Sequence, residues 1–136
     1  MSEQVTFGPG GLVEALRPGA VVVDCSTIAP SYARSAAARL SERGGHFIDA
    51  PCTGSRPGAE GGTLTFMIGG DPEVFENKVK TLLEPMGKQL YYCGTTGLGL
   101  HAMVVAAFGP HTYIRLAVAD DSGPAARAIR RAVNSG

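Results

Sequence analysis

A glycine-rich stretch between two short apolar runs, residues 49–70, constrains the fold of this chain more than any other feature. It has the sequence DAPCTGSRPGAEGGTLTFMIGG, with residues 46–49 leading into it and residues 64–68 closing it. This pattern predicts a strand, a long glycine-rich loop and a second strand. Because glycines let backbone N–H groups approach a ligand closely, we expect the binding residues to lie in this loop.

Strand-like and helix-like segments alternate along the chain before this stretch. Residues 12–16 predict a short helix, residues 20–23 a buried strand at the centre of the sheet, and residues 32–43 a helix with Ser31 as its N-cap. Residues 1–5 are polar, and we expect them to be frayed. The alternation predicts an α/β fold with a mostly parallel sheet and flanking helices.

A further helix is predicted after the glycine-rich stretch. Asp71, Pro72 and Glu73 place a proline and acidic side chains at a helix start, where the helix macrodipole favours negative charge. A strand over residues 90–93 and a second glycine turn over residues 94–99 follow. The side of this helix that is expected to face the core carries Val74, Phe75, Val79, Leu82 and Leu83.

Beyond residue 99 the pattern is less regular. Residues 100–108 are apolar and suit the start of a helix, which Gly109 and Pro110 then break. Residues 114–119 suit either a strand or a helix start, and residues 124–133 predict a basic helix. Residues 100–136 are therefore treated as a divergent C-terminal tail whose structure the pattern does not define.

Composition excludes several classes of function. The 136 residues carry 12 basic and 12 acidic side chains without a charge run, which argues against nucleic-acid and anionic-membrane partners. The apolar runs are too short for a membrane span and the first residues do not resemble a signal peptide, so we expect a cytoplasmic protein. Cys25, Cys52 and Cys93 have no disulfide-framework or ligand spacing and are predicted to be free, buried thiols. The histidine spacings suggest no metal site either.

Three segments, taken in order, carry a resemblance to a known family: VVVDCSTIAP, FIDAPCTGSRPGAEGGTLTFMIGGD and EPMGKQLYYCGTTGLG. Over residues 7–99 the chain resembles the β-hydroxyacid dehydrogenases, which include 3-hydroxyisobutyrate dehydrogenase and tartronate semialdehyde reductase and are related to 6-phosphogluconate dehydrogenase. The resemblance implies that residues 1–99 are the second half of a Rossmann-like cofactor-binding domain. It also implies hydride transfer between NAD or NADP and a small 3-hydroxy acid.

The resemblance also assigns binding residues. The family's D-x-S-T turn lines the nicotinamide end of the cofactor site, and it corresponds here to Ser26 and Thr27. A serine and a glycine in the family's next turn hold the substrate carboxylate, and they correspond to Thr53 and Gly54, followed by Ser55 where glycine is usual. Hydroxyl and backbone N–H donors suit a carboxylate because hydrogen bonds to an ionised acceptor are strong. A simple strand exit at residues 53–55 and a helix cap at residues 26–27 are the structural alternatives.

Two departures from the family concern catalysis. No strand followed by a G-x-G-x-x-G turn, the family's pyrophosphate site, occurs in these residues. The family's catalytic lysine lies four residues after the second glycine of a G-x-G turn, and counting from Gly99 reaches Met103; the asparagine four residues further on corresponds to Ala107. Because a thioether cannot donate a proton, we predict no catalytic residue and no dehydrogenase activity for the chain as it stands.

These observations favour a fragment of a dehydrogenase with a small carboxylate as its ligand. Lys78, Lys80 and Lys88 are poor replacements for the missing acid, since they lie on or after the helix that follows Asp71, away from the expected pocket. The alternatives are a non-catalytic module that self-associates or binds a partner, and a decayed gene product. Half of a doubly wound sheet has an unpaired strand edge, so a homo-oligomer or association through that edge is expected.

Overall fold

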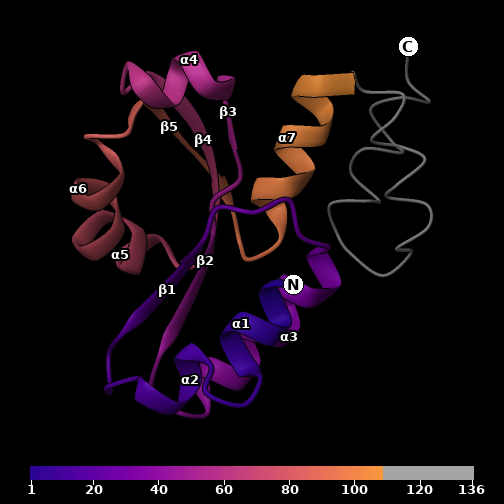
Figure 1. Ribbon diagram of the computed structural model, residues 1–136, viewed down its shortest axis with the longest axis vertical. Coiled ribbons are helices and arrows are strands. Elements are labelled where there is room, and N and C mark those ends of the chain that lie inside the picture. Colours follow the sequence, from indigo (N-terminus) through magenta and orange to yellow (C-terminus); the bar gives the residue numbers. More distant parts are fainter. Residues whose placement is uncertain (109–136) are drawn as a thin grey trace. The chain divides into compact units, whose positions relative to one another are not determined.

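A mixed β-sheet with helices on both faces forms the described part of the chain (Figure 1). The computed structural model describes residues 1–108, and their side chains through Met103. The predictions for residues 114–119 and 124–133 lie outside these described residues. The strands are β1 (Val21–Asp24), β2 (His46–Asp49), β3 (Cys52–Thr53), β4 (Leu64–Gly69) and β5 (Gly87–Gly94).

The sheet contains two parallel pairs that run in opposite directions. β1 and β2 are parallel, with Val22 opposite Phe47, and β4 and β5 are parallel as well. Between the two pairs, β2 and β3 run antiparallel to β4. After β2 pairs with the end of β4, the chain therefore stays on the same edge of β4 and pairs with it again as β3. The predicted α/β fold with a mostly parallel sheet and flanking helices is confirmed.

Helices lie on both faces of the sheet (Figure 1). α1 (Ser2–Phe7), α2 (Leu12–Ala15) and α3 (Pro30–Ser41) lie on one side, and α5 (Pro72–Val74), the π-helical turn η1 (Phe75–Val79) and α6 (Lys80–Leu83) lie on the other. α4 (Ser55–Glu60) lies within the glycine-rich stretch, and α7 (Leu98–Phe108) follows β5. No helix in residues 1–108 has both the length and the apolar character that crossing a bilayer requires.

Alternation along β2 divides the core into two clusters. Phe47 packs with α3 and the following residue, Ile48, packs with the layer formed by α5, η1 and α6. This is the period of two that a strand imposes, since successive side chains point to opposite faces of the sheet. Both faces of β2 are therefore buried, which makes β2 the strand around which the two helical layers are built.

The N-terminal residues form a helix, which contradicts the prediction that residues 1–5 are frayed. Arg39 on α3 contacts α1 in two ways: its guanidinium lies 3.6 Å from the centre of the Phe7 ring, and its Nη1 donates to Glu3 Oε1 at 2.9 Å. Thr6, on α1 itself, is buried. Contacts with α3 thus stabilise a six-residue helix that would be marginal in isolation.

Two predictions for the segment around β1 are wrong. In the described residues β1 pairs only with β2, so it ends the strand order instead of lying at its centre, and only Val22 of its residues is buried. A short apolar run fits a half-buried outer strand as well as a central one. Ser31 is not the N-cap of α3, because the helix begins at Pro30 and its N-cap, Ala29, has no side-chain hydrogen bond.

The helical segment after β4 departs from regular α-helix. Asp71 caps it, as expected of an acid at a helix start, because its Oδ1 accepts hydrogen bonds from Glu73 N at 2.8 Å and Val74 N at 3.1 Å. The π-helical turn η1 inserts an extra residue per turn and rotates α6 relative to the residues before the turn. Leu83 is consequently buried, whereas Leu82, predicted to face the core, is 58% exposed.

The glycine-rich stretch is not one continuous loop, because β3 and α4 interrupt it. β3 places Cys52 opposite Phe66 and Thr53 opposite Thr65 on β4, so the segment after β2 is anchored to the sheet. The cysteines are free, as predicted, but they are not buried: Cys25 is exposed, and Cys52 and Cys93 are half-buried.

Candidate functional site

The two strands that lead to the turns assigned to cofactor and substrate end side by side on the sheet. Asp24, the last residue of β1, is opposite Asp49, the last residue of β2, and Ala50 N donates to Asp24 O at 2.9 Å. Cys25 directly follows β1, and Cys52 begins β3 three residues after the end of β2. Although Cys25 as a residue is exposed, partial burial of its thiol raises the pKa to about 11, and Cys52 and Asp24 raise it further. The thiol of Cys25 is therefore close enough to Cys52 and Asp24 to interact with them electrostatically.

Ser26 and Thr27 lie in the turn after β1, and both are exposed. Ser26 N donates to Asp24 Oδ1 at 2.9 Å, which shapes the turn. Neither residue caps α3, so the interpretation of this turn as a helix cap is wrong. Both line a cavity of about 600 Å³ that α1, the end of β1 and Tyr32 complete.

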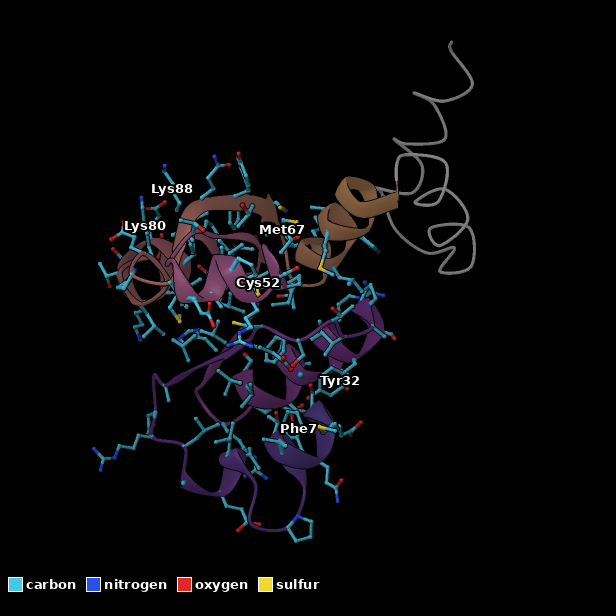
Figure 2. All side chains as sticks on the ribbon, turned by 45° about the horizontal axis from the view of Figure 1, so that its top comes forward. Phe7, Tyr32, Cys52, Met67, Lys80 and Lys88 are labelled. Atoms are coloured by element: carbon cyan, nitrogen blue, oxygen red, sulfur yellow. The ribbon has the colours of Figure 1, made fainter. Side chains whose placement is uncertain are left out.

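Tyr32, which lines this cavity, has a buried hydroxyl that is unpaired in the described part of the chain. Its ring meets Phe47 edge-on, at 6.4 Å between ring centres, and its hydroxyl is buried without a hydrogen-bond partner among the described residues. Figure 2 shows Tyr32 near Phe7, on the α1 side of the sheet. A buried hydroxyl without a partner is costly, so the Tyr32 hydroxyl is a local polar deficit beside the cavity.

The turn at residues 53–55 has an unusual backbone. Gly54 has φ of +129° and Ser55 has φ of +54°, both on the positive side of the Ramachandran plot. Ser55 occupies a left-handed conformation that glycine adopts at lower cost, which explains why glycine is usual there in the family. Thr53, Gly54 and Ser55 are exposed, and none of them lines the cavity beside Ser26 and Thr27.

Asp49 connects these turns to α7, and sequence reasoning did not assign it a role. Its side chain is fully buried, and its two oxygens accept hydrogen bonds from Gly97 N at 2.6 Å and Gly99 N at 3.0 Å. Burial raises the pKa of Asp49, while the N–H groups of Gly97, Gly99 and Leu100 oppose that rise. No salt bridge to Asp49 occurs in the described residues.

Glycines make room for this carboxylate. A Cβ added at Gly69 would lie 2.7 Å from Asp49 Oδ1, and a Cβ added at Gly99 would lie 2.7 Å from Oδ2 and would also collide with the carbonyl oxygen of Met67. Both distances are far below ordinary van der Waals contact, so each glycine is required by the packing. The acid at the end of a strand and the later G-x-G turn were visible in the sequence, but their pairing across 48 and 50 residues was not.

The start of α7 also meets the turn after β1. A Cβ added at Gly97 would lie 3.3 Å from Pro30, the first residue of α3. Met103, at the position where the resemblance implies the family's acid/base residue, follows Gly99 by four residues on α7 and is half-buried. The start of α7 therefore lies against both β2 and the beginning of α3.

The lysines considered as replacement acids have other contacts. Lys78 Nζ donates to Gly19 O at 2.7 Å, and Lys80 forms an ion pair with Glu76 at 2.8 Å. Figure 2 shows Lys80 and Lys88 at the outer rim of the molecule, away from Tyr32 and Cys52. These placements agree with the expectation that none of the three serves the predicted site.

Comparison with known proteins identifies the family. The family described as the NAD binding domain of 6-phosphogluconate dehydrogenase matches residues 1–94. The chain belongs to this family. Its members named below are NAD(P)-dependent hydroxyacid dehydrogenases, so the resemblance seen in the three sequence segments is confirmed.

Curated relatives and solved structures agree on this assignment. The chain is 43% identical over 97 residues to 2-(hydroxymethyl)glutarate dehydrogenase of Eubacterium barkeri, covering 71% of the chain and 32% of the relative. It is 47% identical over 94 residues to the NAD-dependent L-serine dehydrogenase of Pseudomonas aeruginosa, covering 69% and 31%. The crystal structure of a 3-hydroxyisobutyrate dehydrogenase from Salmonella typhimurium superposes with a TM-score of 0.72 at 27% identity, over 85% of the chain and 40% of that structure. The chain thus spans about a third of the length of the curated relatives it matches.

The buried carboxylate predicts a specific pH dependence. Because burial raises the pKa of Asp49 above its ordinary value of 3.8, the folded state holds the proton more tightly than the unfolded state. The free energy of unfolding of the wild type, relative to an Asp49→Asn variant, should therefore rise as pH falls through the folded-state pKa toward 3.8. Urea unfolding of both proteins across this pH range measures the difference, and ¹³C NMR of the Asp49 carboxyl gives the pKa directly. A midpoint below 3.8 would contradict the prediction.

Proposed function

We propose that this chain is the substrate-side part of the cofactor domain of an NAD(P)-dependent hydroxyacid dehydrogenase. In this proposal residues 1–99 form the partial cofactor domain and residues 100–136 a divergent tail. Thr53, Gly54 and Ser55 hold the carboxylate of a small 3-hydroxy acid, and Ser26 and Thr27 line the nicotinamide end of the cofactor site. NAD or NADP would supply the hydride acceptor when bound.

The short connection of both turns to one pair of strand ends carries this proposal. Ser26 and Thr27 follow the end of β1 and line a cavity, and Thr53 lies at the end of β3, four residues after the paired end of β2. Thr53 to Ser55 are exposed and offer a hydroxyl together with backbone N–H groups, as an anion requires. Relatives are named for L-serine and 2-(hydroxymethyl)glutarate, which both carry a carboxylate and a hydroxyl on the β-carbon.

Replacement of Thr53 tests the carboxylate site. In Thr53→Val the shape of the side chain is retained and its hydroxyl is lost, so affinity for 3-hydroxypropionate should fall about fivefold, as expected for one hydrogen bond of about 1 kcal/mol. The matched control is Thr63→Val, at an exposed threonine just before β4. Chemical-shift titration of both variants provides the measurement. Equal affinity of Thr53→Val and wild type would exclude a role for the hydroxyl.

We expect no hydride transfer by these 136 residues. The thioether of Met103 cannot exchange a proton with a substrate hydroxyl, and loss of a positioned acid or base typically slows such a reaction by about 10²- to 10⁴-fold. The absence of a G-x-G-x-x-G turn from these residues removes a major anchor for the pyrophosphate. NAD(P)H absorbance, followed with a panel of 3-hydroxy acids, tests this expectation. Turnover comparable to that of an intact dehydrogenase would refute it.

The outer edge of β1 supports a second candidate function, association with another chain. β1 pairs only with β2 in the described residues, so the backbone groups on its other edge have no strand partner there. Such edges tend to pair with further strands, and a homo-oligomer is the expected product. Sedimentation velocity at several concentrations provides the test. A monomer at all concentrations would argue against this candidate.

A further inference from the structure

We propose that Asp49 is a positioning residue that holds the start of α7 at a fixed place relative to the substrate turn, and so determines where residue 103 is presented. This inference rests on the proposed function, because the turn and residue 103 have a shared chemical role only there. The inference goes beyond the proposed function because it assigns the relative placement of the substrate turn and residue 103 to the Asp49 carboxylate.

The covalent connection on one side of Asp49 is short. Asp49 is the last residue of β2, and Thr53 follows four residues later at the end of β3. Between them the chain is tied to β4: Met67 N donates to Pro51 O at 3.0 Å, and Cys52 and Thr53 pair with Phe66 and Thr65. A shift of Asp49 is therefore transmitted to the substrate turn through a short segment attached to the sheet.

Hydrogen bonds make the connection on the other side. The oxygens of Asp49 accept hydrogen bonds from Gly97 N and Gly99 N separately, so the carboxylate binds the residue before α7 and the second residue of the helix. A carboxylate in this position also interacts favourably with the positive end of the helix dipole. Because the carboxylate binds two N–H groups at the start of α7, it restricts the rotation of the helix as well as its distance from β2. Met103 lies four residues beyond Gly99, and its direction follows from that restriction.

Apolar packing does not provide the same restraint. Within the residues whose side chains are described, neither core cluster includes a side chain of α7, and the buried residues at its start are Gly97 and Gly99. Both glycines are held close to the sheet or to α3, where a Cβ would collide or crowd. The polar contact with Asp49 is thus the specific link between β2 and α7.

A gain of affinity provides the functional test. Under this proposal residue 103 is presented to the substrate turn, so the charged donor added by Met103→Lys should tighten binding of 3-hydroxypropionate about tenfold over wild type. Asp49→Asn, placed in the Met103→Lys background, should abolish that gain, because the isosteric amide cannot accept both N–H bonds in the same way. The matched control is Asp71→Asn in the same background, which removes an exposed carboxylate cap from a different helical segment. The control should retain the tenfold gain. Retention of the full gain in the folded Asp49→Asn double variant would overturn the proposal.

Amide hydrogen exchange distinguishes failure of this inference from failure of the proposed function. In Asp49→Asn alone, the amides of Gly97, Gly99 and the first turns of α7 should exchange at least about tenfold faster than in Asp71→Asn, while those of β2 and β4 keep their protection. Unchanged exchange in α7 would overturn the positioning role, whatever the affinities are. If exchange responds but Met103→Lys gains no affinity, the positioning role stands and the assigned substrate turn is wrong.

A measurement on the wild type covers the case in which Asp49→Asn does not fold. Scalar coupling across the hydrogen bonds, between the Asp49 carboxyl carbon and the amide nitrogens of Gly97 and Gly99, should be detectable by NMR with and without 3-hydroxypropionate. Absence of both couplings in the folded protein would refute the proposal.

Discussion

The carboxylate of Asp49 is buried, has no salt bridge in the described residues, and has its charge met by backbone N–H groups. Such an arrangement is stable only if the donors stay in place, because an unpaired buried charge costs several kcal/mol. The backbone at Gly69 and Gly99 approaches the Asp49 carboxylate so closely that neither position has room for a Cβ, and this packing keeps the donors in place. The end of β2, the end of β4 and the start of α7 consequently form one interlocked unit.

This unit supports the two turns that are proposed to bind cofactor and substrate. β2 is buried on both faces by the two core clusters, so its carboxyl end is rigid. The turn after β1 begins beside it, and the substrate turn follows it after a short segment paired with β4. Rigid strands that present exposed turns are a common basis for binding sites. The site thus needs few residues of its own, provided that the strands beneath it do not move.

Several departures from the family are local replacements within a retained framework. Ser55 adopts a left-handed conformation that suits glycine, and Met103 occupies a helix position where the resemblance implies a lysine. Neither change disturbs Asp49 or its glycines. Asp49 and its glycines, which would position a substrate, are therefore present. The lysine that would exchange a proton is replaced by Met103. This contrast agrees with membership of the dehydrogenase family, and in the proposed function it separates binding from catalysis.

Sequence by itself determined the alternation of strands and helices and the family, because these depend on local patterns and short motifs. The residues of both proposed binding turns come from the same motifs and stay a prediction. Sequence also located the cap at Asp71, which involves neighbouring residues only. Tertiary structure decided the helix at residues 2–7, the outer position of β1 and the exposure of Leu82, which depend on Arg39, on strand pairing and on a π-helical turn. It alone revealed the role of Asp49, because that carboxylate and its N–H donors lie 48 and 50 residues apart and meet only when β2, β4 and α7 are packed together.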